Sequence, residues 1–519
     1  MAERPSFVLF MTDQQRADWL GCAGHPVLRT PHLDALAAGG TRFTNAFVAH
    51  PICMPNRASL LTSRMPSVTG VRHNGVPLPL DSNTFVDRLR RSGYATGLIG
   101  KGHHQPFTDM SPRLPRGTWD TDPYAEARVV PEGIQFREEH AEAWEDGHQI
   151  STPYYGFEHA EPVSRHADGS GGSHARWLRE NVPDFERYIG EENQLPHDFV
   201  RPDAIRTALP EELYATFWIR DRAIDFIAAH AERSEPFFLM VSFPDPHHPF
   251  TPPGKYWDMY DPAEMVLPPS FDGMAGGTPL YELFRARRPE PGTFRGALEA
   301  VDEREAREAM ALTAGMLAMV DDAVGAIRSV IDESAVADRT VQIFTSDHGD
   351  MMGDHGLMLK GPLNFDGVVK VPLLWADPQR PSVGTSDSLV STIDIGASVL
   401  ARAEVDGYNG IQGLDLADTL TNGAAPRDRL LIEHDAHVPI PLTGEWPPRI
   451  RTLVSPEWKL SVYLDQEWGE LFHRVDDPHE MTNRWDDPAV ASVKADLTWC
   501  LSQELMRTVD RSPLPLAMG

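Results

Sequence analysis

The sequence has few cysteines, with only Cys22, Cys53 and Cys500 in 519 residues. Three thiols do not make the framework of paired disulfides that stabilises many small secreted domains. We therefore expect a chain that works in its reduced form. A cytoplasmic location is the simplest interpretation of this cysteine content.

The chain also lacks long apolar runs and an excess of basic residues. No unbroken apolar stretch approaches the roughly 18 residues that a membrane-spanning helix needs, and residues 1–5 lead directly into a strand-like segment without a signal-peptide core. Lys and Arg number 47 against 76 Asp and Glu, which gives a formal net charge of −29. We expect neither nucleic acid nor an anionic membrane as a partner, because both repel an acidic protein.

What the sequence does contain is an alternation of apolar, strand-like runs with amphipathic helical segments. This alternation predicts an α/β fold with a large, mostly parallel sheet covered by helices on both faces. The predicted strands are 6–11, 94–100, 237–243, 341–345 and 371–375, and the predicted helices are 31–36, 81–91, 210–231, 303–332 and 392–401.

Two changes of pattern suggest how the chain is divided. Residues 105–209 have poor periodicity and are rich in Pro, Gly, His and acidic residues, so we interpret them as an insertion that forms a substrate-facing wall and lid. Turn-forming residues near 422–426 predict a boundary between a catalytic domain, 1–424, and a C-terminal subdomain, 425–519. The latter has short strand-like runs, typical of a small antiparallel sheet, and a final helix.

The most informative stretch runs from His50 to Gly70, HPICMPNRASLLTSRMPSVTG. Cys53 stands at the start of a predicted helix, where backbone N–H groups and the helix dipole favour negative charge. Arg57 adds a fixed cation close by, suited to holding an oxyanion. Taken alone, Cys53 is more simply a small buried thiol in a turn.

The pattern Cys53-x-Pro55-x-Arg57, followed by Ala-Ser-Leu-Leu-Thr, resembles the signature of the type I sulfatases of the alkaline phosphatase superfamily. In that family the cysteine is oxidised to Cα-formylglycine, an aldehyde that acts as its hydrate. The resemblance implies that Cys53 is modified by a formylglycine-generating enzyme. One departure is Asn56, where the family most often has Ser.

A second group of residues suits a metal ion. Asp13 and Gln14 follow the first predicted strand, and Asp347 and His348 follow a later one. Ligands bind at the carboxyl ends of strands in open parallel sheets, although Asp13 alone reads first as a helix cap. The resemblance implies that these four residues and Cys53 hold one divalent metal, calcium by family, with manganese or magnesium as alternatives. Gln14 stands for the usual second Asp, and one anionic ligand less should weaken the hold on a hard dication.

Basic residues follow further strands. Lys101 and His103 are two residues apart, so on an extended segment they point to the same side. The resemblance assigns Lys101 and Lys360 to the sulfate group and His103 to the hydroxyl of the formylglycine hydrate. It assigns His247 as the general acid for the leaving oxygen, a task suited to a group that titrates near neutrality.

The implied activity is hydrolysis of a small anionic sulfate ester to an alcohol and sulfate. Arg57 and the metal would hold the attacking hydroxyl of residue 53, which attacks sulfur in line.

Two alternatives stay open. A phosphonate monoester, phosphodiester or sulfamate hydrolase of the same superfamily is favoured by Gln14 and disfavoured by Lys101 and His103, because phosphonate monoester hydrolases carry Tyr and Thr there. A non-catalytic anion-binding protein with unmodified Cys53 is supported by Asn56 alone. The organic half of the substrate and a homo-oligomeric state are also left open.

Overall fold

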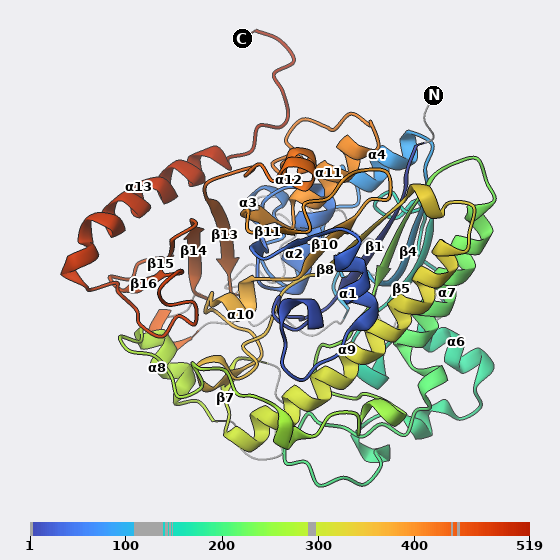
Figure 1. Cartoon of the computed structure of the whole chain (residues 1–519), viewed down its shortest axis with the longest axis horizontal. Helices are drawn as coiled ribbons and strands as arrows, with labels where there is room; N and C mark the ends of the chain where they lie inside the picture. The colour runs from blue at the N-terminus through green and yellow to red at the C-terminus, as the bar shows by residue number, and fades with distance from the viewer. Residues whose placement is uncertain are drawn as a thin grey trace, which may run out of the picture.

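The computed structural model describes residues 4–107, 139–140, 144, 147, 149–288, 297–436, 440–443 and 447–518. An eight-stranded sheet lies at its centre, in the order β11-β2-β10-β8-β1-β6-β4-β5 (Figure 1). The strands of this sheet are β1 Ser6–Thr12, β2 Thr41–Phe43, β4 Ala95–Lys101, β5 His159–Val163, β6 Phe237–Ser242, β8 Thr340–Ser346, β10 Leu373–Ala376 and β11 Thr385–Ser386.

Most of the central sheet is parallel, as predicted. The neighbours β8, β1, β6, β4 and β5 all pair in parallel, whereas β10 is antiparallel to both β8 and β2. In this register Thr12 lies opposite Ser346, and Gly100 lies opposite Ser242. The carboxyl ends of β1, β8, β4 and β6 therefore meet at one edge of the sheet, where ligands bind in such folds.

Helices cover both faces of the sheet because side chains alternate along each strand. Phe7, Leu9 and Met11 of β1 pack with α2, α4 and α11, whereas Val8 and Phe10 pack with α1, α7 and α9. This alternation has the period of two expected for a strand buried on both sides. The helices are α1 Pro31–Ala38, α2 Cys53–Thr62, α4 Phe85–Arg91, α7 Ala215–Ala231, α9 Glu303–Asp332 and α11 Asp394–Arg402.

The shorter elements connect these layers or lie at their edges. These shorter helices and strands are β3 Ala46–Phe47, β7 Glu299–Ala300, β9 Leu357–Met358, β12 Val390–Ser391, α3 Pro66–Thr69, α6 Ser173–Asn181, α8 Pro279–Arg285, α10 Asp366–Val369 and α12 Ala417–Asn422. The strand β5 of the central sheet and the helix α6 both lie within residues 105–209, the segment that the sequence suggested was irregular.

Helix α9 differs from one expectation drawn from the sequence. It is the one described helix that is long and apolar enough to cross a membrane by length and composition, although the sequence shows no unbroken apolar run of that length. Ala, Met, Leu, Val and Ile raise its average hydropathy between the polar positions. Because 89% of that window is buried inside the protein, α9 is a core helix in this structure.

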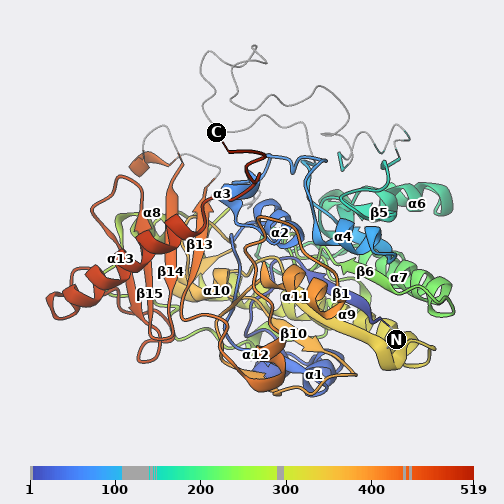
Figure 2. The ribbon, with the colours of Figure 1, turned by 90° about the horizontal axis from the view of Figure 1, so that it is seen from above.

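A second, four-stranded antiparallel sheet forms the C-terminal part, and Figure 2 shows it with α13 to one side of the central sheet. Its elements are β13 Leu430–Asp435, β14 Arg449–Val454, β15 Trp458–Tyr463, β16 Gly469–His473 and the helix α13 Ala491–Arg507. Ile432 and Val454 share a core cluster with Phe47 and Val369 of the larger part. The boundary at 424/425 stays a prediction, as does the lid role of 105–209, much of which lies outside the described residues.

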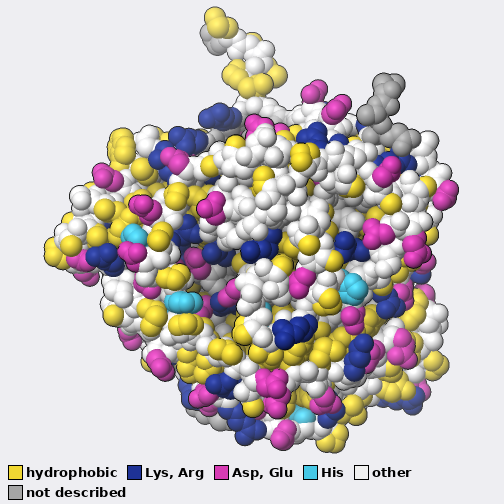
Figure 3. All heavy atoms as spheres, viewed as in Figure 1, with side chains coloured by type: hydrophobic (Ala, Val, Ile, Leu, Met, Phe, Trp, Pro, Cys, Tyr) yellow, Lys and Arg dark blue, Asp and Glu magenta, His cyan; other side chains and the backbone are white. Residues whose placement is uncertain are grey.

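The surface of the face seen in Figure 3 mixes acidic and basic side chains with scattered apolar ones. The net charge of −29 is therefore not gathered into one acidic field on this face. Such mixing is typical of a surface that serves solubility.

Candidate active site

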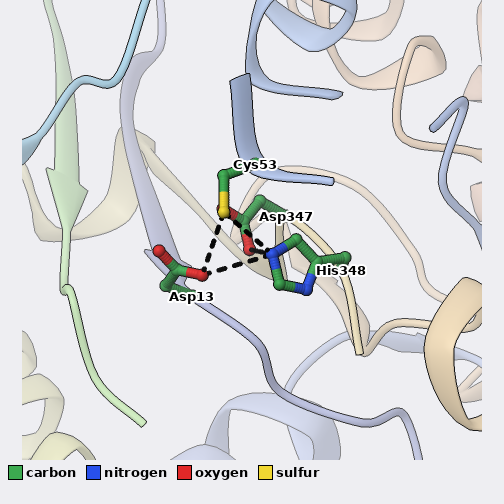
Figure 4. A group of neighbouring side chains, drawn as sticks. All are labelled: Asp13, Cys53, Asp347 and His348. Atoms are coloured by element: carbon green, nitrogen blue, oxygen red, sulfur yellow. Dashed lines mark hydrogen bonds and ion pairs between the residues drawn. The ribbon is translucent and has the colours of Figure 1, made fainter. Parts of the chain in front are cut away.

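Four buried side chains meet where β1, β8 and α2 come together. Asp13 and Asp347 each follow the last residue of a strand, and the paired register of β1 and β8 brings them to the same edge. Cys53 reaches the same place from the first turn of α2, and His348 follows Asp347 (Figure 4). The ligand atoms of these four residues all lie within 4.8 Å of one another.

The sulfur of Cys53 lies among groups of both charges. Its Sγ is 3.1 Å from Nε2 of His348 and 3.7 Å from Oδ1 of Asp13. Burial and the Asp13 carboxylate oppose ionisation of the thiol. The positive charges of Lys360, Lys101 and His348 outweigh them and lower the pKa of Cys53.

Arg57 lies one turn along α2 and connects the segments that form the site. Its Nε donates to Oδ2 of Asp347 at 2.7 Å, and its Nη1 donates to the carbonyl of Lys101 at 2.8 Å and to Ser242 Oγ at 2.9 Å. Its Nη2 is 3.8 Å from Oδ2 of Asp13 and is without a hydrogen-bond partner in the described part of the chain. A buried guanidinium that faces two buried carboxylates offsets much of their charge.

The donor set of this cluster fits a divalent cation. Burial opposes the charge on His348, but the nearby carboxylate of Asp347 and the Cys53 sulfur raise its pKa to about 9. An imidazole held in its charged form by surrounding anions marks a place where a cation is favoured, and a metal would displace that proton. The oxygens of Asp13 and Asp347 suit calcium, magnesium or manganese, all of which prefer oxygen ligands.

Gln14, the fifth predicted ligand, lies directly beside this cluster. Its Oε1 accepts a hydrogen bond from Lys360 Nζ at 2.6 Å, and its Nε2 donates to Oδ2 of Asp350 at 2.6 Å. Its backbone N–H donates to Oδ1 of Asp347 at 3.1 Å. The amide oxygen is therefore taken by Lys360 in this structure, and its role as a metal ligand stays a prediction.

The two predicted lysines flank the cluster. Lys101 Nζ is buried, forms an ion pair with Oδ2 of Asp13 and lies 2.6 Å from Nε2 of His166. Lys360 Nζ lies 2.9 Å from Nε2 of His247. The structure thus brings Lys101, Lys360 and His247 together, as the resemblance implies.

His166 was missed by the sequence analysis. It lies in the loop after β5, inside the segment expected to be irregular, and its ring stacks on that of His247 with centroids 3.7 Å apart and planes 9° apart. The one available signal was its place just after a strand, but that strand was itself not predicted. His166 could not be found without the sheet that positions it.

His103 does not follow the geometry expected from an extended segment. The backbone turns after β4, so that His103 has a φ of +56°, and its ring stacks on Phe107 with centroids 3.8 Å apart. Its Nδ1 has no hydrogen-bond partner among the described residues. The side chains of Lys101 and His103 are therefore not related by strand alternation, and the contact of His103 with residue 53 stays a prediction.

Asn56, the departure from the family pattern, is a buried bridge between three segments. Its Nδ2 donates to the carbonyl of Asp347 at 2.7 Å. Its Oδ1 accepts from the backbone N–H of Ala49 at 3.0 Å and from Thr392 Oγ1 at 2.9 Å. Asn56 thus fixes the loop that carries Asp347 and His348.

We expect Asn56→Ala to lower the free energy of unfolding by about 2–4 kcal/mol, because three buried groups lose their partner. Asn56→Ser should lose less, since a hydroxyl can still satisfy part of the bridge. Urea denaturation measures both. Asn409→Ala, which removes an exposed hydrogen bond to the Arg511 carbonyl, is the control and should change stability by about 0.5 kcal/mol or less. Equal stabilities of Asn56→Ala and the control would contradict the bridging role.

Comparison with known proteins identifies the family. The family model described as Sulfatase matches residues 5–405, and that described as N-sulphoglucosamine sulphohydrolase, C-terminal, matches residues 353–507. An arylsulfatase of Clostridium perfringens is 26% identical over 498 residues, which cover 92% of this chain and 90% of that protein. The multifunctional alkaline phosphatase superfamily protein PehA of Trinickia caryophylli is 28% identical over 530 residues, 96% of each chain.

A solved structure resembles the whole fold. The phosphonate monoester hydrolase of Agrobacterium radiobacter superposes with a TM-score of 0.77 at 24% identity, over 98% of this chain and 97% of that one. This likeness confirms the predicted alkaline phosphatase-like fold. Together with the sulfatase match over more than half of the sequence, it confirms the resemblance first seen around Cys53. The chain belongs to the sulfatase family of the alkaline phosphatase superfamily, and it is an enzyme of that family.

Proposed function

We propose that this enzyme hydrolyses a small sulfate monoester to an alcohol and sulfate at the site around Cys53. The observation that carries the proposal is the arrangement of charge. At the edge of the central sheet, Lys101 and Lys360 flank a cluster of metal-type ligands, although the protein as a whole is acidic. Two ammonium groups next to a metal site suit a tetrahedral anion, whose charge they neutralise as the transition state forms.

We further propose that residue 53 acts as formylglycine and that Asp13, Asp347 and His348 hold one divalent metal, with Gln14 as an additional oxygen ligand. The metal, when bound, supplies Lewis-acid stabilisation of oxygen charge. The hydrated aldehyde supplies an attacking hydroxyl and, as a geminal diol, a second hydroxyl through which the sulfate can be expelled. Conversion needs a formylglycine-generating enzyme, which recognises the segment around Cys53, Pro55 and Arg57.

The chain's own residues divide the remaining work. Arg57 faces Asp13 and Asp347 and holds their carboxylates and the first turn of α2 in place. Lys101 and Lys360 bind the sulfate oxygens. In this structure Nε2 of His247 accepts a hydrogen bond from Lys360 Nζ at 2.9 Å, and burial with the nearby positive charge holds the pKa of His247 well below its ordinary value, not near neutrality as expected from the sequence. We propose that His247 protonates the leaving oxygen once the bound anion draws Lys360 away from Nε2. Its Nδ1 lies 2.5 Å from the carbonyl of His248. That second contact orients the ring.

A second candidate is hydrolysis of a phosphonate monoester, phosphodiester or sulfamate. Gln14 in place of an acidic ligand favours it, and one relative is named as multifunctional within the superfamily. The lysine at 101 favours the sulfate ester. Both reactions would use the same proposed nucleophile and metal. The two candidates are therefore distinguished by which ester the enzyme hydrolyses faster.

The substrate class is tested with 4-nitrophenyl esters that share one leaving group. We expect kcat/KM for 4-nitrophenyl sulfate to exceed that for 4-nitrophenyl phenylphosphonate and bis(4-nitrophenyl) phosphate by at least about tenfold, since each 1.36 kcal/mol of differential transition-state binding gives a factor of ten. A preference for either phosphorus ester would replace the sulfatase proposal by the second candidate. The N-sulfated aniline analogue tests the sulfamate in the same assay.

Removal of divalent metal should abolish turnover and lower the melting temperature. Without a cation, Arg57, Lys101 and His348 still offset the charge of Asp13 and Asp347, but the native state loses the stabilisation that ligand binding supplies. The measurement is activity and thermal unfolding after dialysis against a chelator, then after return of calcium, manganese or magnesium. Full turnover by protein shown to be metal-free by elemental analysis would contradict the metal assignment.

A further inference from the structure

The loop after β5 carries the imidazole of His166 to Lys101 and Asp13. Nε2 of His166 lies 2.6 Å from Lys101 Nζ and 3.4 Å from Oδ2 of Asp13. An ammonium group has only hydrogens to donate, so Nε2 accepts and the ring hydrogen lies on Nδ1. His166 and the Asp13 carboxylate thus both accept hydrogen bonds from the Lys101 ammonium group.

The same ring also fixes its neighbour. His166 stacks on His247 with centroids 3.7 Å apart and planes 9° apart, and Lys360 Nζ lies 2.9 Å from Nε2 of His247. Two lysine–histidine pairs therefore lie side by side, with the two rings face to face. The plane of His247, which decides where its Nε2 points, is set on one side by this stack.

The backbone around His166 is held in a conformation that few residues adopt. Arg165 and Ala167 on either side have φ values of +60° and +61°. The loop is fixed by hydrogen bonds from Gly171 N to the Ser164 carbonyl at 2.7 Å and from Asp168 N to Thr251 Oγ1 at 3.2 Å. Non-glycine residues with positive φ persist where the surroundings determine them, and they gather at functional sites.

We propose that His166 is a positioning residue with two separable effects: it draws the Lys101 ammonium toward the bound anion, and it sets the ring plane of His247 for proton transfer to the leaving oxygen. The insertion thereby contributes to the centre of the site as well as to its wall. The proposal rests on the proposed function for its second effect only, because binding of an inorganic anion to Lys101 does not depend on which ester is hydrolysed.

Two substitutions separate these effects. His166→Gln keeps an amide oxygen that can reach Lys101 but loses the flat ring, whereas His166→Phe keeps the stack on His247 but cannot accept a hydrogen bond. His166→Ala loses both. His159→Ala, an exposed histidine on β5 of the same insertion, is the control and should behave as wild type.

The first measurement is calorimetric binding of inorganic sulfate to the metal-loaded enzyme. We expect His166→Ala and His166→Phe to bind sulfate at least tenfold more weakly than wild type, and His166→Gln to bind within about threefold of wild type, since it restores one hydrogen bond. Wild-type affinity in His166→Ala, or no recovery in His166→Gln, would overturn the effect on Lys101.

The second measurement is steady-state kinetics on 4-nitrophenyl sulfate. We expect kcat to fall about 10²-fold in His166→Ala and His166→Gln and to recover in His166→Phe, because misplacing a general acid costs about that much. Equal kcat values in Gln and Phe variants would overturn the effect on His247. A wild-type enzyme that hydrolyses no sulfate ester but still shows the binding pattern would sink the proposed function and leave the effect on Lys101 standing.

Discussion

Cys53→Ala should abolish turnover, lowering kcat by at least about 10⁴-fold, because the proposed mechanism forms its covalent intermediate on residue 53. The side chain is buried at the first turn of α2, 3.1 Å from His348 and 3.7 Å from Asp13. Alanine is smaller and apolar, so the fold should survive with its melting temperature within a few degrees of wild type. The measurement is kcat on 4-nitrophenyl sulfate beside a thermal unfolding curve.

Cys22→Ala and Cys500→Ala are the matched controls for this experiment. Cys22 is the middle residue of the short 3-10 helix η1, Gly21–Ala23, and its backbone N–H donates to Asp34 Oδ1. Cys500 lies on α13, and both cysteines are partly exposed. Each should retain wild-type kcat. Substantial turnover in Cys53→Ala would show that the reaction does not pass through residue 53.

Arg57→Met should be the most damaging change after substitution of Cys53. The guanidinium is buried beside Asp13 and Asp347, and its removal leaves two buried carboxylates short of a partner. Breaking a buried ion pair from one side costs about 3–5 kcal/mol of stability. We also expect kcat to fall by about 10²–10³-fold, as when one preorganised charge-stabilising donor is lost. Urea denaturation and steady-state kinetics measure the two losses.

Arg91→Met tests whether these losses belong to the site. Arg91 is largely exposed on α4 and pairs with Asp87 across one helical turn. Surface pairs of this kind contribute about 0–1 kcal/mol, so stability should change little and turnover not at all. If Arg57→Met were as mild as Arg91→Met, Arg57 would have no part in holding the site together.

The fold could be predicted where local pattern and tertiary packing agree. The apolar run of β1, residues 7–11, is buried on both faces of the sheet. Helix α9 begins at the predicted residue 303 because Asp302 and Glu305 form a capping box there. Ends were less exact where a side chain sets the boundary: α4 begins at Phe85, since Thr84 accepts the N–H of Asp87. Strand β5 was missed because its sequence, HAEPV, has a Pro and two polar residues at a sheet edge.

The site was predictable at strand ends and not in loops. Asp13 and Asp347 follow β1 and β8 directly, so the parallel register alone brings them together. His166 enters through a loop whose path depends on tertiary contacts, and His103 leaves the strand direction through a turn at positive φ. Sequence spacing carries no information about either of these two conformations.

The mass of the peptide that contains Cys53 tests the central claim most directly. The protein is taken from its native host, digested, and the peptide is assigned as thiol or aldehyde, with turnover per molecule measured on the same preparation. We predict formylglycine at residue 53, in a fraction that matches the fraction of active sites. An unmodified Cys53 thiol in fully active enzyme would contradict the proposed mechanism.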